Sequence, residues 1–289
     1  MLALLSMIFW GMSYIWSKVV FEYLGPIETV FIRLIISAFT LLLLLTITRK
    51  WQVIKTRHYP IFIVSSFLNP FLYFIGESYG LQLVTPTISA VIISTIPVFT
   101  PMIAFIVLKE RLKLLNIVGL AVSILGVLII VLDKSIGNLG ISWYGILFLF
   151  GAVAAAVGHG ILLKKLTFHY NPVIIITTQN IIGIFYFLPL VFFWGNGNIS
   201  TDTFDAHLII NLLLLGIFAS SLAFVFYTRS VKEFGIARAS LYANLIPVFT
   251  AIFSYYFLNE TLSIQKLTGM MIVILGVILS EYNFKQSKV

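Results

Sequence analysis

The sequence has no cysteine, and only 10% of its 289 residues are charged. The lack of cysteine excludes disulfide-stabilised scaffolds, cysteine-ligated zinc domains and thiol enzymes. The low charge excludes a disordered chain, which needs low hydrophobicity and high charge. Hydrophobic residues make up 60% of the chain and the mean hydropathy is +1.08, whereas a soluble domain is about 45–50% apolar. The composition therefore predicts a polytopic membrane protein.

Motifs for enzymes and pumps are also missing. There is no G-x-x-x-x-G-K-[ST] phosphate loop, no H-E-x-x-H zinc motif and no G-x-S-x-G serine motif. The four histidines are scattered along the chain, which argues against a metal site. We therefore expect no cofactor, no metal and no enzymatic activity, and an intramembrane enzyme is kept only as an alternative.

Ten runs of about 20 mainly apolar residues are long enough to cross a bilayer as helices. Runs such as Leu41 to Leu45 and Ile124 to Leu132 do not alternate apolar and polar residues, which argues against a membrane β-barrel. The predicted fold is thus all-α with ten transmembrane helices. The runs lie near 2–21, 27–48, 60–80, 86–108, 114–132, 143–164, 172–194, 208–228, 236–258 and 264–282.

The distribution of positive charge predicts the orientation of these helices. With the N-terminus in the cytoplasm, fourteen of the 18 lysines and arginines fall on inner connections or the C-terminal tail. Such an excess is typical of cytoplasmic loops. We therefore predict a multi-pass protein of the cell (inner) membrane with both termini cytoplasmic. The net charge of +8 is explained by topology, and no nucleic-acid partner is expected.

An internal repeat divides the chain into two halves. The sequence IPVFT occurs at 96–100 and again at 246–250, and Glu110 and Gly119 align with Glu260 and Gly269 at the same offset of 150 residues. Earlier helices match more weakly: Gly11 aligns with Gly158, and Lys18 with Lys165. The predicted domains are a first five-helix repeat (1–134), a second repeat (140–283) and a cytoplasmic tail (284–289). Five helices per repeat invert the second copy, as in many secondary transporters, although a channel stays an alternative.

The order of certain residues resembles the EamA family of the drug/metabolite transporter superfamily. The matching residues occur in this order: Trp10 and Gly11, Lys18, Arg33, Pro97, Glu110 with Leu112, and Gly119 with Leu125 to Val127. The pattern then returns in the second half, so the resemblance covers essentially the whole chain.

The resemblance implies a ten-helix fold with a central cavity and, most commonly, export of amino acids or related small metabolites. It further implies that helices one, three, four, six, eight and nine line the cavity, and that a homodimer could form through helices five and ten. The substrate does not transfer, because members of the family differ widely. An importer and an exporter of drugs or lipophilic metabolites are alternatives of the same fold.

Polar residues at helical spacing mark the faces that we expect to turn inward. In lipid, such side chains face partners or a water-filled cavity. The spacing of Asn69, Tyr73 and Glu77 places all three on one face of the third helix, and a lone histidine in the sixth helix is either a structural residue or part of the site. The predicted substrate-binding residues are Trp10, Tyr14, Asn69, Tyr73, Glu77, His159, Tyr242 and Asn244.

Three ionisable residues, Lys18, Arg33 and Glu77, are predicted to share the outer third of the membrane. Charged groups inside a membrane are costly and commonly functional. Three roles stay open: a static ion pair of Glu77 with Arg33 or Lys18, a gate at the outer mouth, and a proton site at Glu77. Pro97 and Pro247 free backbone groups of their helices and are predicted hinges. The only partners expected are a small solute, the lipid bilayer and a second copy.

Overall fold

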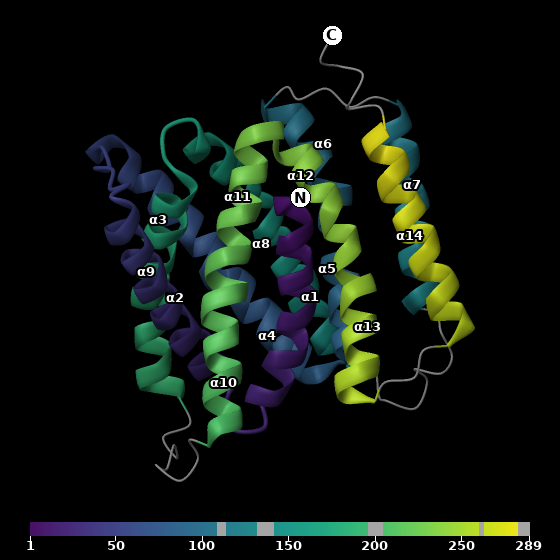
Figure 1. Cartoon of the computed structure of the whole chain (residues 1–289), viewed down its shortest axis with the longest axis horizontal. Coiled ribbons are helices and arrows are strands. Elements are labelled where there is room, and N and C mark those ends of the chain that lie inside the picture. Colours follow the sequence, from purple (N-terminus) through teal and green to yellow (C-terminus); the bar gives the residue numbers. More distant parts are fainter. Residues whose placement is uncertain (109–113, 132–141, 196–204, 260–262, 283–289) are drawn as a thin grey trace.

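The computed structural model describes residues 1–108, 114–131, 142–195, 205–259 and 263–282. The described residues form helices joined by short connections, as the composition predicts (Figure 1). The predicted repeat residues Glu110, Leu112 and Glu260, the boundary between the two predicted domains and the tail 284–289 lie outside the described residues.

The helices of the first half follow the predicted apolar runs. They are α1 (Leu2–Val20), α2 (Pro26–Thr48), η1 (Thr56–His58), α3 (Tyr59–Ser66), η2 (Phe67–Leu72), α4 (Tyr73–Leu83), α5 (Pro86–Ile93), α6 (Ile96–Leu108) and α7 (Leu114–Val131). Those of the second half are α8 (Trp143–Thr167), α9 (Pro172–Trp194), α10 (Ala206–Leu214), η5 (Leu215–Leu222), α11 (Ala223–Phe234), α12 (Ile236–Leu241), η6 (Tyr242–Leu245), α13 (Ile246–Leu258) and α14 (Ile264–Tyr282).

Helix starts follow from local sequence. Proline occupies the first position of α2, α5 and α9, where its missing N–H costs nothing and its φ already suits a helix. The Asn171 side chain accepts a hydrogen bond from the Val173 amide at 3.0 Å, and Asp205 accepts one from the Leu208 amide at 2.8 Å. These N-caps satisfy amide groups that the first helical turn leaves without partners.

Four of the predicted spans are not regular α-helices throughout. The third span changes at η2, where Asn69 leaves helical geometry (φ −147°, ψ 119°) just before Pro70. The eighth span contains the π-helical segment η5. The fourth span breaks between α5 and α6, just before the predicted hinge Pro97. The ninth span breaks at η6, just before the predicted hinge Pro247. Because proline cannot donate a backbone hydrogen bond, the two prolines fit these breaks.

Within the described residues, seven segments are long and apolar enough to cross a membrane. They are Leu2–Val20, Pro26–Thr48, Thr56–Leu83, Trp143–Thr167, Pro172–Trp194, Ala206–Phe234 and Ile236–Leu258. The runs predicted near 86–108, 114–132 and 264–282 are not in this set; the first is divided into α5 and α6, and the other two form α7 (Leu114–Val131) and α14 (Ile264–Tyr282). The structure thus describes a helical bundle with several candidate membrane spans.

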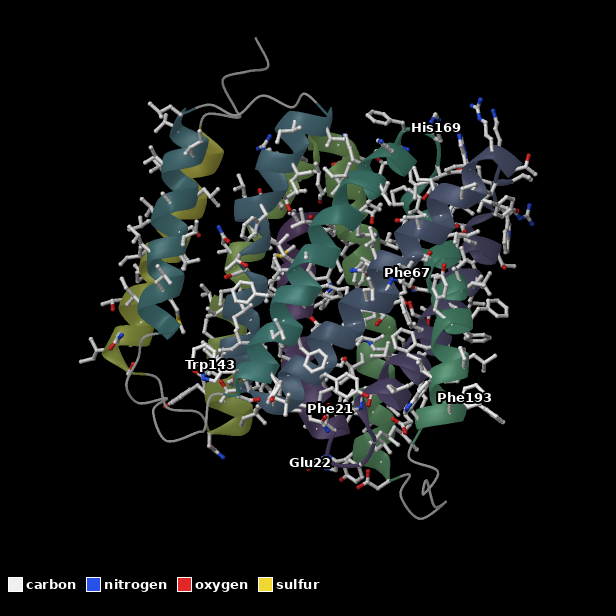
Figure 2. All side chains as sticks on the ribbon, turned by 180° about the vertical axis from the view of Figure 1, so that it is seen from behind. Phe21, Glu22, Phe67, Trp143, His169 and Phe193 are labelled. Atoms are coloured by element: carbon white, nitrogen blue, oxygen red, sulfur yellow. The ribbon has the colours of Figure 1, made fainter. Side chains whose placement is uncertain are left out.

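Helices α7 and α14 pack against each other at one edge of the bundle (Figures 1 and 2). Their backbones approach closely at glycines: a Cβ added to Gly126 would lie 2.7 Å from the Gly269 carbonyl oxygen, and one added to Gly276 would lie 2.5 Å from the Ser123 amide nitrogen. Small residues permit such approach between membrane helices. The glycines of the predicted fifth and tenth helices therefore join these two helices within one chain.

The connections sort to two ends of the bundle. At one end, the residues after α2 meet those between α8 and α9, where the Gln52 side-chain amide donates to the His169 carbonyl at 3.1 Å. At the other end, the Tyr23 hydroxyl donates to Asp205 at 3.0 Å. Figure 2 shows His169 at one end and Glu22, Trp143 and Phe193 toward the other. The end with 49–58, 168–171 and 229–233 is called the basic end below.

The connection between Tyr23 and Asp205 lies outside the membrane-spanning segments. The Leu208 amide hydrogen bond, together with the Tyr23 hydroxyl, lowers the pKa of the Asp205 carboxyl from its ordinary value. The same hydrogen bond raises the pKa of the Tyr23 phenol, because phenolate would face a carboxylate. Asp205 is therefore held ionised as the N-cap of α10.

Candidate functional site

A partly enclosed cavity lies between helices of the two halves. The residues that line it are mainly apolar or aromatic, with a few polar groups among them, which is the usual make-up of a small-molecule site. The first half contributes Trp10, Asn69, Tyr73, Ile93, Ile96 and Thr100. The second half contributes Ala156, His159, Gly160, Phe224, Tyr227, Ile236, Ala243 and Ile246.

Four of the predicted substrate-binding residues line this cavity: Trp10, Asn69, Tyr73 and His159. They come from α1, η2, α4 and α8, which are far apart in the sequence. The other four, Tyr14, Glu77, Tyr242 and Asn244, do not line it. The structure thus brings one predicted residue from each of these four segments to the cavity and places the other four outside its lining.

An aromatic wall forms one side of the cavity. The Trp10 ring lies 5.0 Å from the Phe224 ring and 5.2 Å from the Tyr227 ring, both in tilted or edge-on geometry. Its indole N–H donates to the Ala219 carbonyl at 3.2 Å. This bond fixes the indole against η5 and α11, so the wall joins the first and second halves of the chain.

His159 is anchored by a hydrogen-bonded partner behind it. Its Nε2 lies 3.2 Å from Gln179 Nε2, which also donates to Ser65 Oγ at 2.7 Å. His159 and Gln179 are buried. The histidine is thus both a structural group tied to α9 and a wall residue of the cavity, so the two readings of this residue are not exclusive.

Thr100 supplies a further polar group at the cavity. Its hydroxyl oxygen is buried and makes no hydrogen bond within the described part of the chain. A buried polar group without a partner costs free energy, so this hydroxyl is a ready partner for a solute. Sequence reasoning did not select Thr100, although it ends the repeated IPVFT sequence.

Glu77 lies one helical turn beyond the cavity, in a polar cluster behind Tyr73. The Tyr73 hydroxyl donates to Glu77 Oε1 at 2.8 Å. The Tyr14 hydroxyl and the Arg33 guanidinium lie near the same carboxylate, although the Tyr14 oxygen makes no hydrogen bond of good geometry to a described residue. Tyr73 therefore belongs to both the cavity wall and the Glu77 cluster.

Arg33 does not form the direct ion pair that was one reading of its role. An ion pair among the described side chains joins Arg229 to Glu233. Arg33 instead donates from Nε to Ser220 Oγ at 2.7 Å, and its guanidinium lies 4.3 Å from the centre of the Phe74 ring. Arg33 thus lies near the Glu77 carboxylate without an ion pair to it among the described contacts.

Tyr242 and Asn244 lie outside the cavity lining, because the ninth span does not continue as one α-helix. The 3₁₀ segment η6 changes the helical register at Tyr242–Leu245, so that Ala243 and Ile246 face the cavity instead. Tyr242 packs near the Phe234 ring at 6.4 Å. Asn244 is buried, and its side-chain nitrogen has no described partner.

Phe224 and Tyr227 are wall residues that the prediction did not select. They lie one turn apart on α11 and contact Trp10. Aromatic residues make up 15% of the chain, so an aromatic residue in an apolar helix carries little signal by itself. The signal in the sequence for these two wall residues is their spacing of one helical turn on the eighth span.

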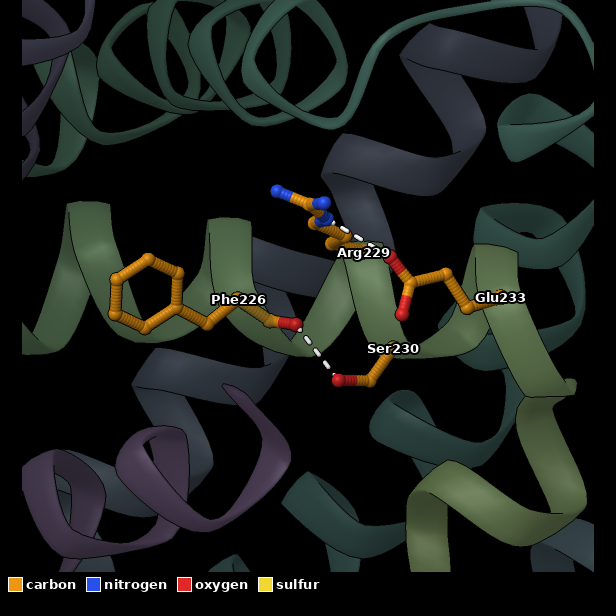
Figure 3. A network of polar contacts seen from close by, with 4 residues as sticks. All are labelled: Phe226, Arg229, Ser230 and Glu233. Carbon is orange, nitrogen blue, oxygen red and sulfur yellow. Dashed lines mark hydrogen bonds and ion pairs between the residues drawn. The ribbon is translucent and has the colours of Figure 1, made fainter. Parts of the chain in front are cut away.

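The basic residues of α11 lie away from the cavity wall. Arg229 Nε and Glu233 Oε1 are 2.8 Å apart, one turn from each other, and both side chains are more than half exposed (Figure 3). The Ser230 hydroxyl donates back to the Phe226 carbonyl at 2.9 Å (Figure 3). Exposed pairs of this kind contribute little to stability, but Glu233 is thereby committed to Arg229.

The EamA-like transporter family model matches residues 1–132 and again 143–282. The chain belongs to the EamA-like transporter family. It is therefore a multi-pass membrane protein of a transporter family, as the resemblance in its sequence predicted.

Related proteins match this chain along nearly its whole length. An uncharacterized transporter of Archaeoglobus fulgidus is 26% identical over 94% of this chain and 95% of its own. The uncharacterized transporter YoaV of Bacillus subtilis is also 26% identical, over 100% and 99%. A solved structure described as "Crystal structure of protein" superposes with a TM-score of 0.82 at 10% identity, over 98% of this chain and 97% of the other. At that identity, the superposition speaks for the fold alone.

Proposed function

We propose that this protein is a secondary-active permease that exports amino acids or related small amphipathic metabolites from the cell. The observation that carries the proposal is the cavity, whose wall is shared by helices of both halves. Secondary transporters built from inverted repeats place their substrate at such an interface. In this account the chain has ten spans, arranged as two inverted five-span halves.

The chemistry of the cavity supports an amphipathic solute. Trp10, Phe224 and Tyr227 offer flat apolar surfaces, while Asn69, Thr100 and His159 offer hydrogen-bonding groups. Aromatic side chains with few convergent polar groups suit a solute that has both an apolar body and a polar end. A strongly charged sugar phosphate would fit poorly, because no lysine or arginine lines the described cavity.

An asymmetry between equivalent residues supports alternating access. Thr250 Oγ1 donates to the Gly11 carbonyl at 3.2 Å, and α1 lies so close to α13 that a Cβ on Gly11 would stand 2.7 Å from the Phe249 Cβ. The repeat equivalents are Thr100 and Gly158. Thr100 has no described hydrogen-bond partner, and a Cβ on Gly158 would meet only Leu68 side-chain atoms within 4 Å.

This asymmetry has the form expected of one state of an inverted-repeat carrier. The Gly11–Thr250 pair makes the close contact and the equivalent Gly158–Thr100 pair does not, so an exchange of roles between the two pairs would produce the opposite state. Gly11 lies nine residues before Val20, where α1 terminates on the side of the bundle opposite the basic end. Gly158 lies nine residues before Thr167, where α8 terminates at the basic end. We propose that the present state is closed away from the basic end and open toward it.

The basic end is assigned to the cytoplasm of a cell whose inner membrane holds the protein. The described connections at this end carry Lys50, Lys55, Arg57, Lys165 and Lys232, as the positive-inside rule requires of the cytoplasmic side. A tag added at Val289 should then be reached by an impermeant reagent only after the membrane is opened. Labelling of intact cells would reverse the assignment.

Glu77 is proposed as the coupling site. Its link to the cavity through Tyr73 would let protonation of the carboxylate change the wall that a solute contacts. Arg33 is proposed as a neighbouring gate residue, since it connects the same cluster to Ser220 on η5. Lys18 keeps the gating role that its sequence position predicts.

Counterflow in proteoliposomes tests the transport proposal. Vesicles preloaded with one unlabelled solute would take up the same labelled solute faster than empty vesicles, and a panel of amino acids, nucleosides and sugars would identify the class. Trans-stimulation by amino acids would support the proposal. Silence with the folded protein across the panel, or conductance without saturation, would move the assignment to lipophilic solutes or to a channel.

A further inference from the structure

We propose that a second pocket, at the basic end and separate from the cavity, binds the phosphodiester headgroup of an anionic glycerophospholipid. This pocket is an open depression of the surface. Its lining comes from three separate parts of the chain: Lys50, Trp51 and Gln52 after α2, His169 and Tyr170 between α8 and α9, and Lys232 near the end of α11. The inference does not depend on which solute the cavity carries.

Hydrogen bonds hold the three parts of the pocket together. The Gln52 side chain donates to the His169 carbonyl at 3.1 Å and accepts from the Asn171 amide at 3.0 Å. The Lys232 ammonium donates to the Tyr170 carbonyl at 3.3 Å. These bonds fix Gln52, the 169–171 connection and Lys232 relative to one another, while Lys50 is exposed beside them.

A second layer of contacts supports the same wall. Tyr170 is buried, and its hydroxyl lies 2.7 Å from His58 Nδ1 and accepts a hydrogen bond from the Lys55 amide at 3.0 Å. The rings of His58 and His169 stack with their centres 4.7 Å apart. These contacts place the connection between α2 and α3 against the connection between α8 and α9.

The charge of this pocket selects a negative ligand. Lys50 and Lys232 line it, and Lys55 and Arg57 lie in the connection that forms its back. No carboxylate lines it among the described side chains, and the nearby Glu233 is paired with Arg229. A phosphate oxygen could accept hydrogen bonds from both lysines without displacing an existing acidic partner.

The position of the pocket selects a lipid as the source of that phosphate. Two large aromatic side chains stand at its mouth: Trp51 is 59% exposed and Phe168 is 69% exposed. Exposed tryptophan is enriched at the level of lipid headgroups. The apolar helices α2 and α8 end, and α9 begins, within a few residues of the pocket lining, so acyl chains of a bound lipid would lie along these helices while the headgroup meets the lysines. Basic pockets of this kind between membrane helices bind anionic headgroups.

Native mass spectrometry of the purified full chain can test this site. The protein in a neutral detergent would be titrated with phosphatidylglycerol and, separately, with phosphatidylcholine. The expected result is preferential retention of phosphatidylglycerol. The double variant Lys50→Gln/Lys232→Gln should lose about thirty-fold in affinity, from the contribution of two lysines near a headgroup. Equal binding of the two lipids by the unaltered protein would overturn the proposal.

A matched double variant distinguishes a built site from a diffuse positive surface. Arg49 and Lys165 lie toward the same end but do not line the pocket, so Arg49→Gln/Lys165→Gln removes equal charge, leaves the Arg229–Glu233 pair intact and should keep the lipid preference. An equal loss in both double variants would overturn the proposal in favour of general electrostatic attraction. Gln52→Ala removes no charge but breaks two wall contacts, and it should also weaken binding.

Inorganic phosphate separates the two sources of the ligand. Phosphate at millimolar concentration should leave phosphatidylglycerol bound, because the lipid also gains contact between its chains and the helices. Displacement of the lipid by phosphate, with phosphate retained in its place, would overturn the lipid assignment and make this a soluble-anion site. Thermal midpoints of each variant in phosphatidylcholine would show that the variants are folded, so that a lost lipid signal reports the pocket.

Discussion

Thr250 and Gly11 are joined by a hydrogen bond of 3.2 Å from the threonine hydroxyl to the glycine carbonyl, whereas their repeat equivalents Thr100 and Gly158 make no such bond in the described structure. The bond connects α13 to α1 at a point where the two helices are nearly in backbone contact. In an inverted-repeat carrier, this difference is what distinguishes one state from the other.

Replacement of either threonine by valine should shift the balance between the two states in opposite directions. Thr250→Val removes the bond found here, which is worth about 0.5–1.5 kcal/mol, and should lower the population of the present state about two- to ten-fold. Thr100→Val should favour the present state, because it removes the bond expected only in the other one. Labelling of a cavity cysteine, or solute affinity measured from each side, would report the shift. A shift of the same sign in both variants would contradict the account.

Neutralising Glu77 should separate coupling from binding. Glu77→Gln keeps the size of the side chain and can still accept the hydrogen bond from Tyr73, but it cannot take up and release a proton. We expect solute exchange to persist and accumulation driven by a pH gradient to fall to the level seen without a gradient. Uptake in proteoliposomes with an imposed gradient measures both quantities.

Glu28→Gln is the matched control for this measurement, since Glu28 is also a buried carboxylate but lies at the start of α2. It should leave accumulation unchanged. Full pH-driven accumulation by Glu77→Gln would reject Glu77 as the coupling site and leave it with a structural role.

Substitution of Trp10, which lies in the aromatic wall, should lower the affinity for the solute, whereas substitution of Trp16 should not. Trp10→Phe shortens the wall and removes the indole N–H bond to Ala219, so the half-saturation concentration should rise about two- to ten-fold, equivalent to about 0.5–1.5 kcal/mol. Trp16 packs with the α10 residues Leu208 and Leu212 and does not line the cavity, so Trp16→Phe should have little effect. Equal effects of the two changes on counterflow would show that Trp10 acts only through packing.

The close contact between α7 and α14 should not tolerate a larger side chain. Gly126→Leu places its Cβ 2.7 Å from the Gly269 carbonyl oxygen, and overpacking of this kind costs about 1–3 kcal/mol. The thermal midpoint of the purified protein should therefore fall. Gly151→Leu is the control, because a Cβ there meets no atom within 4 Å, and its midpoint should stay near that of the unaltered protein. An unchanged midpoint for Gly126→Leu would contradict the packing described here.

Much of the architecture could be predicted from the sequence, because apolar length and glycine placement are local signals. The runs predicted as spans coincide with helical segments, and the glycines of α7 and α14 fall on their mutual contact. Trp10, Asn69, Tyr73 and His159 reach the cavity, since a polar or amphipathic residue in an apolar helix has few stable positions other than an interior one.

The remaining errors arise where the helices depart from regular geometry. An α-helical wheel assumes about 100° per residue, and the 3₁₀ segment at Tyr242–Leu245 changes that angle, so Ala243 replaces Asn244 on the cavity wall. The break at Asn69 also separates Glu77 from the cavity by one turn of a new helix. Phe224 and Tyr227 become wall residues only through their contact with Trp10, and no sequence pattern encodes which two helices meet.

Accessibility of a single cysteine in the cavity tests alternating access most directly, since the natural chain has no cysteine to remove. Ala243→Cys places a thiol on the cavity wall, while Ala90→Cys places one in a fully buried position away from it. An impermeant thiol reagent should label Cys at 243 from one side at a time, with solute gradients and the Thr250→Val change moving the preferred side, and should leave position 90 unlabelled. Labelling of position 243 from both sides at once, or from one side under every condition, would contradict a carrier with alternating access.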